Sequence, residues 1–187
     1  MKTLIIDNGT KHLQALKNLL SKNVLTIIKS SEDLPTPSDF NLIILSGSSK
    51  FAVKENPEKF VEEIKLVKNS NIPIIGICAG CEIVAYTYNS QLESFKPKEK
   101  GIKEIKIVNS NYFKVNKPIK VYEAHHWAIK KLGKDLTGIA KSKHGWEIIK
   151  VKDRNVYGLQ FHPEMLTDML LGDEIFRKIT KLITNGN

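Results

Sequence analysis

Short apolar runs alternate with amphipathic segments through the first half of the chain. The apolar runs are rich in isoleucine, valine and leucine, which is typical of strands buried on both faces. Apolar residues that recur every three or four positions between these runs indicate helices. Alternating strands and helices predict an α/β fold with a mostly parallel central sheet flanked by helices. The predicted strands cover residues 4–7, 24–28, 42–45 and 72–77, and the predicted helices cover residues 11–20, 57–67 and 82–88.

The pattern changes to short strands separated by turn signals after residue 90. Clusters of asparagine, glycine and aspartate bound these strands, which predicts a small antiparallel extension of the sheet. An amphipathic helix over residues 168–183 closes the chain. At 187 residues, of which 41% are hydrophobic, the chain is long enough for one well-buried core, and we expect a single domain over residues 1–187. The predicted strands cover residues 102–108, 119–122, 136–140, 146–151 and 156–159.

The net charge of +9 comes from lysine, because Arg154 and Arg177 are the only arginines among 29 basic residues. Nucleic-acid recognition relies largely on arginine, so this composition indicates an ordinary solvated surface or an acidic protein partner, and we expect no nucleic-acid partner. No apolar run is long enough to span a bilayer, and we expect no membrane association. The two cysteines are three residues apart and form no disulfide framework, so we expect a cytoplasmic protein.

Cys78 lies where the predicted strand over residues 72–77 meets the helix that follows. Gly76 and Gly80, two residues to either side, relieve the crowding of a sharp strand-to-helix turn, as in the nucleophile elbow of hydrolases. A cysteine at such a turn points outward beside the first amides of the helix, and these amides favour the thiolate. Cys81 lacks glycines at the equivalent spacing. The spacing therefore predicts that Cys78 is a nucleophile.

His162 lies far downstream in a His-Pro-Glu sequence. The proline favours an extended backbone at His162, so the side chains of His162 and Glu164 point the same way. A carboxylate that holds one imidazole nitrogen leaves the other nitrogen free to accept a thiol proton. Taken alone, such a sequence more often marks a partly buried histidine at a strand end. Together with Cys78, it predicts a thiol enzyme with a Cys-His-Glu triad.

Small residues follow the predicted strand over residues 42–45 and end at the same sheet edge as Cys78. Their backbone amides can approach a ligand closely. The amide of Gly47 or Ser48, together with that of Ala79, could hold the oxyanion of a tetrahedral intermediate. Taken alone, the segment is also compatible with a plain turn.

These residues resemble the class I glutamine amidotransferases, a triad family whose elbow reads Gly-x-Cys-x-Gly and whose base strand ends in His-Pro-Glu. The resemblance extends over nearly the whole chain. Residues 5–9 are similar to the family's opening strand and turn, residues 45–47 to its oxyanion loop, and residues 157–164 to its signature. Spacing and length are most similar to the stand-alone glutaminase subunits of archaeal-type GMP synthases. The resemblance implies a flavodoxin-like glutamine amidotransferase fold.

In that family a cysteine attacks the side-chain amide of glutamine, ammonia leaves, and water hydrolyses the glutamyl thioester. The resemblance implies that Cys78 is the nucleophile, His162 the general base and acid, and Glu164 the residue that orients His162. Ser48 and Ala79 would supply oxyanion amides. It further implies glutamine as substrate and, as partner, an ATP-pyrophosphatase-type synthetase subunit that uses the ammonia for GMP and hence for purine biosynthesis. We expect no metal and no cofactor in this chain, with ATP and Mg²⁺ only on the synthetase.

Three positions depart from the family pattern. Glu82 stands where the family usually has a glutamine that helps to bind the substrate, so the donor capacity of this side chain is inverted. Ser48 belongs to a loop that commonly reads Ser-Gly-Gly-Pro, and its β-carbon restricts a backbone flip there. His125 falls where GMP synthase subunits have a Ser-His followed by an acidic residue, which this chain lacks. We count Gly47, Glu82 and His125 with Ser48 and Ala79 as oxyanion or substrate-binding residues.

Four other interpretations stay open. Cys78 and Cys81 form a C-x-x-C sequence at a helix start, which can be a redox centre or a disulfide that silences the nucleophile. The two cysteines could instead bind zinc together with His125 and His126. The same triad could instead hydrolyse a γ-glutamyl peptide or another amide whose amine meets Glu82. A family member with weakened catalysis could serve in a binding or regulatory role.

Overall fold

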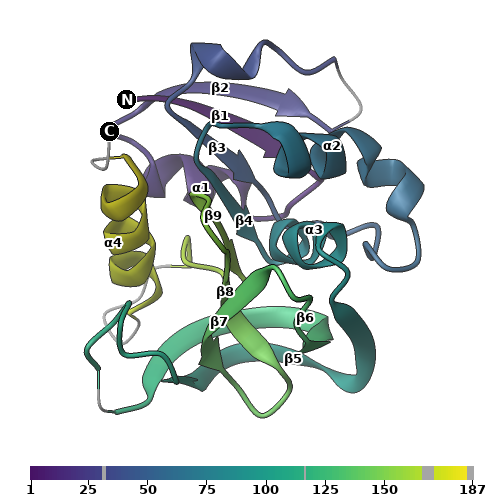
Figure 1. Ribbon diagram of the computed structural model, residues 1–187, viewed down its shortest axis with the longest axis vertical. Helices are drawn as coiled ribbons and strands as arrows, with labels where there is room; N and C mark the ends of the chain where they lie inside the picture. Colours follow the sequence, from purple (N-terminus) through teal and green to yellow (C-terminus); the bar gives the residue numbers. More distant parts are fainter. Residues whose placement is uncertain (31–32, 116, 166–170, 185–187) are drawn as a thin grey trace.

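The computed structural model describes residues 1–30, 33–115, 117–165 and 171–184, and its strands form a single sheet (Figure 1). One part of this sheet is parallel, and its inner strands are buried on both faces, as their continuous apolar sequences predict. In sheet order the parallel strands are β2 (Val24–Lys29), β1 (Lys2–Asp7), β3 (Leu42–Leu45), β4 (Ile74–Ile77) and β9 (Val156–Leu159).

The antiparallel part of the sheet continues from β9. An additional pairing of its last strand with its first closes these strands on themselves below the parallel part (Figure 1). This extension is larger than predicted, because β5 and β6 extend well beyond the apolar segments from which they were predicted. In sheet order its strands are β8 (Trp146–Val151), β6 (Ile119–Lys131), β5 (Gln91–Ile107) and β7 (Leu136–Lys141).

Helices cover both faces of the parallel part, which confirms the predicted fold class. The side chain of Ile5 on β1 packs in the core on one face, and those of Leu4 and Ile6 pack in the core on the other. No helix within the described ranges is both long and apolar enough to cross a membrane. α1 (Leu13–Leu19) and α4 (Gly172–Thr184) lie over the face of Ile5, and α2 (Val61–Asn69) and α3 (Ala79–Thr87) lie over the other face (Figure 1).

Several boundaries differ from the predicted ones for identifiable reasons. β5 begins at Gln91, well before the predicted residue 102. Its first half was not predicted because it is an exposed ribbon rich in lysine and glutamate, without a regular pattern of apolar residues. β6 continues past the predicted residue 122 through a stretch where buried polar side chains replace apolar ones. The region predicted as a helix from residue 57 begins with a 3₁₀ segment, η2 (Pro57–Phe60), that directly precedes α2. A further 3₁₀ segment, η1 (Pro37–Asp39), lies in the connection before β3.

α1 begins at Leu13 rather than at the predicted residue 11. α3 begins at Ala79, directly after Cys78, and not at the predicted residue 82. The sequence pattern did not indicate this start, because the small residues of the first turn hide the helical period. α4 is described from Gly172, and the predicted helix start at residue 168 lies outside the described residues. The early start of α3 matters for the site, since it places the first free amides of the helix beside Cys78.

Candidate active site

Cys78 occupies a strained turn between β4 and α3, with φ 52° and ψ −106°. The flanking glycines make this turn possible. A β-carbon on Gly76 would lie 2.2 Å from the carbonyl oxygen of Gly80, and one on Gly80 would lie 2.2 Å from the carbonyl oxygen of Leu45. The amide of Cys78 donates a 2.8 Å hydrogen bond to the carbonyl of Leu159 on β9, which ties the elbow to the neighbouring strand. The predicted elbow geometry is therefore present, with Cys78 at the N-terminus of α3.

His162 reaches Cys78 because β9 pairs directly with β4. The backbone amide of His162 donates a 2.8 Å hydrogen bond to the carbonyl of Tyr122, which fixes the chain after β9. Its Nδ1 lies 2.8 Å from Oε1 of Glu164, and its ring interacts electrostatically with the sulfur of Cys78. A carboxylate oxygen only accepts, so Nδ1 carries the proton in this pair and Nε2 is left for the sulfur.

The electrostatics of His162 follow from these neighbours. Burial disfavours its charged form, but the sulfur of Cys78 and the carboxylate of Glu164 outweigh burial and raise the pKa of His162 to about 10. Both His162 and Glu164 are buried. His162 is therefore held as an imidazolium beside the sulfur at neutral pH.

The loop after β3 lies against this triad. The Oγ of Ser46 accepts a 2.9 Å hydrogen bond from the amide of Asn8, and the Asn8 side chain returns a 3.1 Å hydrogen bond to the Ser46 carbonyl. A β-carbon on Gly47 would lie 3.3 Å from Cε1 of His162 and 3.5 Å from Cβ of Cys78. The loop is thus held by the turn after β1 and leaves just enough room for the two side chains.

A cavity of about 200 Å³ opens beside the sulfur of Cys78. This volume is below the roughly 300 Å³ at which pockets for drug-sized ligands begin, and it suits a ligand of amino-acid size. Gly47 and Glu164 are not wall residues, but Gly47 lies against Cys78 and His162, and Glu164 hydrogen-bonds His162. Of the residues predicted from the sequence, the wall contains Ser48, Cys78, Ala79, Glu82, His125 and His162.

Glu82 lies at the cavity wall with a side chain that is only 4% exposed. Its Oε1 accepts a 3.2 Å hydrogen bond from the side-chain amide of Gln160, and the Val53 backbone also favours the charged carboxylate. Burial exceeds the effect of these donors and of nearby His125, and it raises the pKa of Glu82 to about 7. Glu82 therefore presents a carboxyl group that changes between neutral and charged near neutral pH.

His125 contributes to the cavity wall, but its ring nitrogens face the chain. Nδ1 donates a 2.7 Å hydrogen bond to the carbonyl of Trp127, and Nε2 lies 3.5 Å from Oε2 of Glu123. Burial lowers the pKa of His125, but Glu123 and Glu147 outweigh it and raise this pKa to about 9. Both nitrogens are directed away from a ligand in the cavity, so His125 offers that ligand the carbon edge of its ring.

Several wall residues were missed in the sequence analysis. The ring of His12 lies edge-on to that of His162, with centroids 5.0 Å apart, and burial together with His162 lowers the pKa of His12. His12 follows β1, whose carboxyl end meets the same sheet edge as Cys78, so the rule for parallel sheets could have identified it. Lys98 reaches the wall from the exposed part of β5, for which the sequence carries no local signal. The other wall residues are Thr10, Lys11, Ser49, Lys50, Phe51, Ala52, Ala124, His126 and Trp127.

Cys81 has surroundings unlike those of Cys78. Both cysteines are free thiols, but Cys81 is fully buried, and a β-carbon on Gly158 would lie 2.6 Å from its sulfur. Burial, together with nearby carboxylates, raises the pKa of Cys81 well above its usual value. This environment suits packing between α3 and β9 rather than redox exchange. Within the described ranges, Cys78, Cys81 and His126 belong to no group of side chains close enough to share a metal ion.

Comparison with protein families assigns most of the chain to one family. The model of the family "Glutamine amidotransferase class-I" matches residues 4–180.

Individual relatives carry related names. A glutamine-hydrolysing GMP synthase from Ehrlichia canis is 32% identical over 176 residues, which cover 88% of this chain and 33% of the relative. One subunit of a glutamine-hydrolysing GMP synthase from Pyrococcus furiosus is 31% identical over 143 residues, which cover 75% of this chain and 74% of the relative. The chain thus spans about a third of the full-length GMP synthases that it matches, at 33% to 37% of their length.

A solved structure of a GMP synthase subunit from Thermoplasma acidophilum has a TM-score of 0.84 at 25% sequence identity. The match covers 99% of this chain and 94% of that one. A glutamine amidotransferase structure from Thermotoga maritima shares the fold, with a TM-score of 0.79 at 16% identity over 100% of this chain and 99% of that one.

Proposed function

We propose that the chain, which belongs to the class I glutamine amidotransferase family, hydrolyses the side-chain amide of glutamine and passes the ammonia to a synthetase that makes GMP. The observation that carries this proposal is the convergence of Cys78, His162 and Glu164 beside one small cavity. The names of the relatives from Ehrlichia canis and Pyrococcus furiosus support GMP synthesis as the use of the ammonia.

The first half of the reaction forms a thioester. The thiolate of Cys78 attacks the side-chain carbonyl carbon of glutamine, and negative charge develops on the carbonyl oxygen. The backbone amides of Ala79 and Ser48 are the candidate donors to this oxyanion, since both residues line the cavity. His162 Nε2 gives its proton to the departing nitrogen, so ammonia leaves rather than the amide anion. Glu164 keeps Nδ1 protonated and holds the ring in position throughout.

The second half of the reaction releases glutamate. The imidazole of His162, now neutral, takes a proton from a water molecule that attacks the thioester carbonyl. The carbon–sulfur bond breaks, and the sulfur of Cys78 leaves as the thiolate beside the reprotonated imidazolium. The pair returns to its starting charges, so His162 acts once as acid and once as base in each turnover.

The proposed partner is an ATP-pyrophosphatase-type synthetase subunit that holds the ATP and Mg²⁺ of the overall reaction. Lys11, Lys50 and Lys98 surround the cavity, within a chain of net charge +9. An acidic surface on the synthetase would complement this rim and bring the two sites together, since complementary charges speed association and orient the partners.

The test is to measure glutamate and ammonia released from glutamine by the purified chain, both alone and in the presence of a GMP-forming synthetase. We expect slow release by the chain alone and faster release with the synthetase, and none from the Cys78→Ala variant under either condition. Absence of release from the unmodified chain under both conditions would refute the glutaminase proposal.

Glu82 supports one second candidate, hydrolysis of a γ-glutamyl peptide or another amide with an amine-bearing leaving group. Its carboxylate is charged above about pH 7, where it would attract a cation and hinder a carboxylate-bearing ligand. If glutamine is the substrate, Glu82→Gln lowers the KM for glutamine at pH 8. A higher KM in this variant, with faster turnover of γ-glutamyl amines by the unmodified chain, would favour the second candidate.

A further inference from the structure

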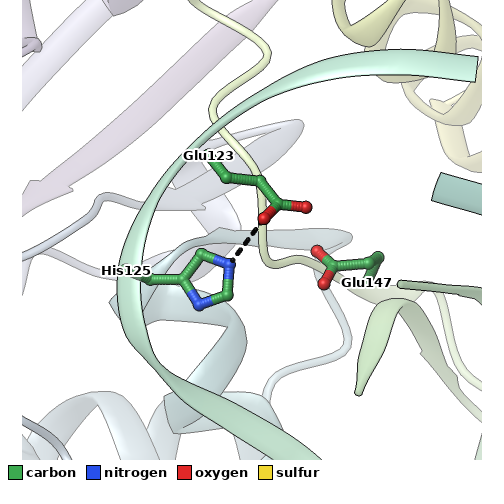
Figure 2. A group of neighbouring side chains, drawn as sticks. All are labelled: Glu123, His125 and Glu147. Atoms are coloured by element: carbon green, nitrogen blue, oxygen red, sulfur yellow. Dashed lines mark ion pairs between the residues drawn. The ribbon is translucent and has the colours of Figure 1, made fainter. Parts of the chain in front are cut away.

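Three buried side chains from β6 and β8 converge between the active-site cavity and a second cavity. Figure 2 shows the carboxylates of Glu123 and Glu147 and the imidazole of His125 pointing toward one another. One ligand atom from each lies within 4.8 Å of the other two, and no other such group occurs in the described part of the chain. Glu123 and Glu147 are each 1% exposed and His125 is 3% exposed. None of the three touches the proposed reaction at Cys78 with a polar atom.

Three polar atoms of this cluster have no hydrogen-bond partner. Oε1 of Glu123, Nε2 of His125 and Oε2 of Glu147 are buried without a hydrogen bond. A buried polar atom left unsatisfied costs about 1–3 kcal/mol, and more when it is charged. Nδ1 of His125 donates to the Trp127 carbonyl. An ion that displaces the proton from Nε2, which the two carboxylates hold when the site is empty, would meet a lone pair there. Such a cluster of electron-pair donors calls for a positive charge at its centre.

The spacing distinguishes a shared cation from a shared proton. Nε2 of His125 lies 3.5 Å from Oε2 of Glu123. A charge-assisted N–H···O bond is about 2.7–2.9 Å long, so a proton on Nε2 is poorly placed to be shared. Two ligands about 2.0–2.2 Å from one tetrahedral zinc ion are roughly 3.4 Å apart. The observed separation is that of two ligands on one ion.

We propose that Glu123, His125 and Glu147 bind a divalent transition-metal ion, with zinc the best match. A mixed imidazole and carboxylate set suits zinc better than Mg²⁺ or Ca²⁺, which prefer oxygen ligands alone. Two carboxylates balance the charge of one divalent ion in this buried place. The set differs from the zinc ligands considered in the sequence analysis, sharing only His125, and it departs from the expectation that the chain holds no metal.

Supporting contacts resemble those around established metal ligands. A metal-bound histidine usually donates its second ring N–H to a carbonyl or carboxylate, as His125 does to Trp127. A metal-bound carboxylate is usually held by a further hydrogen bond, as Ser142 Oγ holds Oε1 of Glu147 at 2.7 Å. Three protein ligands leave a fourth tetrahedral position for water or a small anion.

The second cavity offers the ion a route to the cluster. It has a volume of about 180 Å³, and Glu123, Glu99 and Ser142 contribute to its wall. His125 of the same cluster contributes to the wall of the active-site cavity, as do its neighbours Ala124, His126 and Trp127. An ion at this point would therefore join β6 to β8 directly behind the substrate wall.

The test measures metal binding by the Cys78→Ala chain, in which the active-site thiol cannot compete for the ion. After chelator treatment and dialysis, zinc is titrated calorimetrically and Co²⁺ is added as a spectroscopic probe. We expect one ion per chain, visible Co²⁺ d–d bands without a thiolate charge-transfer band, and at least hundredfold weaker binding of Mg²⁺ and Ca²⁺. Glu147→Gln should weaken zinc binding at least hundredfold, whereas the matched variant Glu99→Gln, beside the same cavity, should leave it unchanged.

Two results would overturn the proposal. One is a folded Cys78→Ala chain that binds neither zinc nor Co²⁺, which would leave a proton or a water molecule at the cluster. The other is zinc binding that Glu147→Gln does not weaken, which would place the ion elsewhere. If Glu147→Gln does not fold, anomalous scattering from zinc-soaked crystals of the Cys78→Ala chain locates the ion directly. Because no glutamine turnover is measured, these outcomes are independent of the proposed glutaminase activity.

Discussion

The side-chain amide of Gln160 donates a 3.2 Å hydrogen bond to the buried carboxylate of Glu82. This contact joins the reactive helix to the strand end that carries His162 two residues later. Glu82 is thus both a wall residue of the cavity and a link between the nucleophile and base segments. Its protonation state affects both roles.

The first prediction concerns the stability of the Glu82→Gln variant as a function of pH. Burial raises the pKa of Glu82 to about 7 in the folded chain, whereas an unfolded glutamate titrates at about 4.3. The stabilisation from the bound proton is therefore fully present below about pH 4 and is lost as pH rises through about 7. Relative to the unmodified chain, Glu82→Gln should gain about 1–3 kcal/mol of unfolding free energy at pH 8 and little at pH 4.5.

Urea unfolding at both pH values, in chelator-containing buffer, measures this difference. Glu62→Gln, at an exposed glutamate on α2, is the control and should change the unfolding free energy by less than about 0.5 kcal/mol at either pH. A pH-independent effect of Glu82→Gln would show that the carboxyl group does not titrate in this range.

The second prediction concerns Glu164→Gln. The amide keeps the shape of the carboxylate but removes the charge that supports the His162 imidazolium. We expect kcat for glutamine hydrolysis to fall about 10²–10⁴-fold with a small change in KM, because the contact acts on the reacting groups rather than on substrate binding. The alkaline limb of the pH–rate profile, set by the pKa of His162 at about 10, should move to lower pH. An unmoved limb would argue against the orienting role of Glu164.

The third prediction concerns the close packing of Gly47 against His162 and Cys78. Alanine there would place a β-carbon 3.3 Å from Cε1 of His162, so the ring must shift by a few tenths of an ångström. We expect Gly47→Ala to lower kcat about 10–100-fold while the melting temperature changes little, since displacements of this order strongly affect reacting geometry. Gly172→Ala is the matched control, because its β-carbon would make ordinary 3.4 Å contacts with Phe161 and Pro163 rather than with the triad. Equal activities of the two variants would contradict the proposed fit.

The fourth prediction concerns the two thiols. Cys78 lines the cavity, whereas Cys81 is fully buried with its pKa raised well above the usual value. Iodoacetamide should modify one cysteine per folded chain at pH 7.5, none in Cys78→Ala, and both after unfolding, as counted by intact mass spectrometry. Mild oxidants should leave no Cys78–Cys81 disulfide. Rapid labelling of Cys81 in the folded chain, or such a disulfide, would revive the redox interpretation.

The local parts of the site could be predicted from the sequence, and the distant contacts could not. The turn at Cys78 depends on glycines two residues away, and the pairing of His162 with Glu164 depends on their spacing of two residues. Both features are therefore visible in the local sequence. Glu123 and Glu147, in contrast, are carboxylates on strands that look half-exposed in the sequence, and only the pairing of β6, β8 and β7 buries them. Tertiary structure overrides the local polarity signal at these positions.

The adjacency of β4 and β9 also bears on when the chain becomes active during folding. Cys78 and the His162 segment are neighbours in the sheet, yet every residue of the antiparallel part lies between them in the sequence. Strand pairs this distant in sequence close slowly, because the intervening loop must first lose its entropy. We therefore expect the reactive pair to assemble late, after most of the polypeptide has folded. Recovery of enzymatic turnover on refolding would then lag behind the recovery of secondary structure.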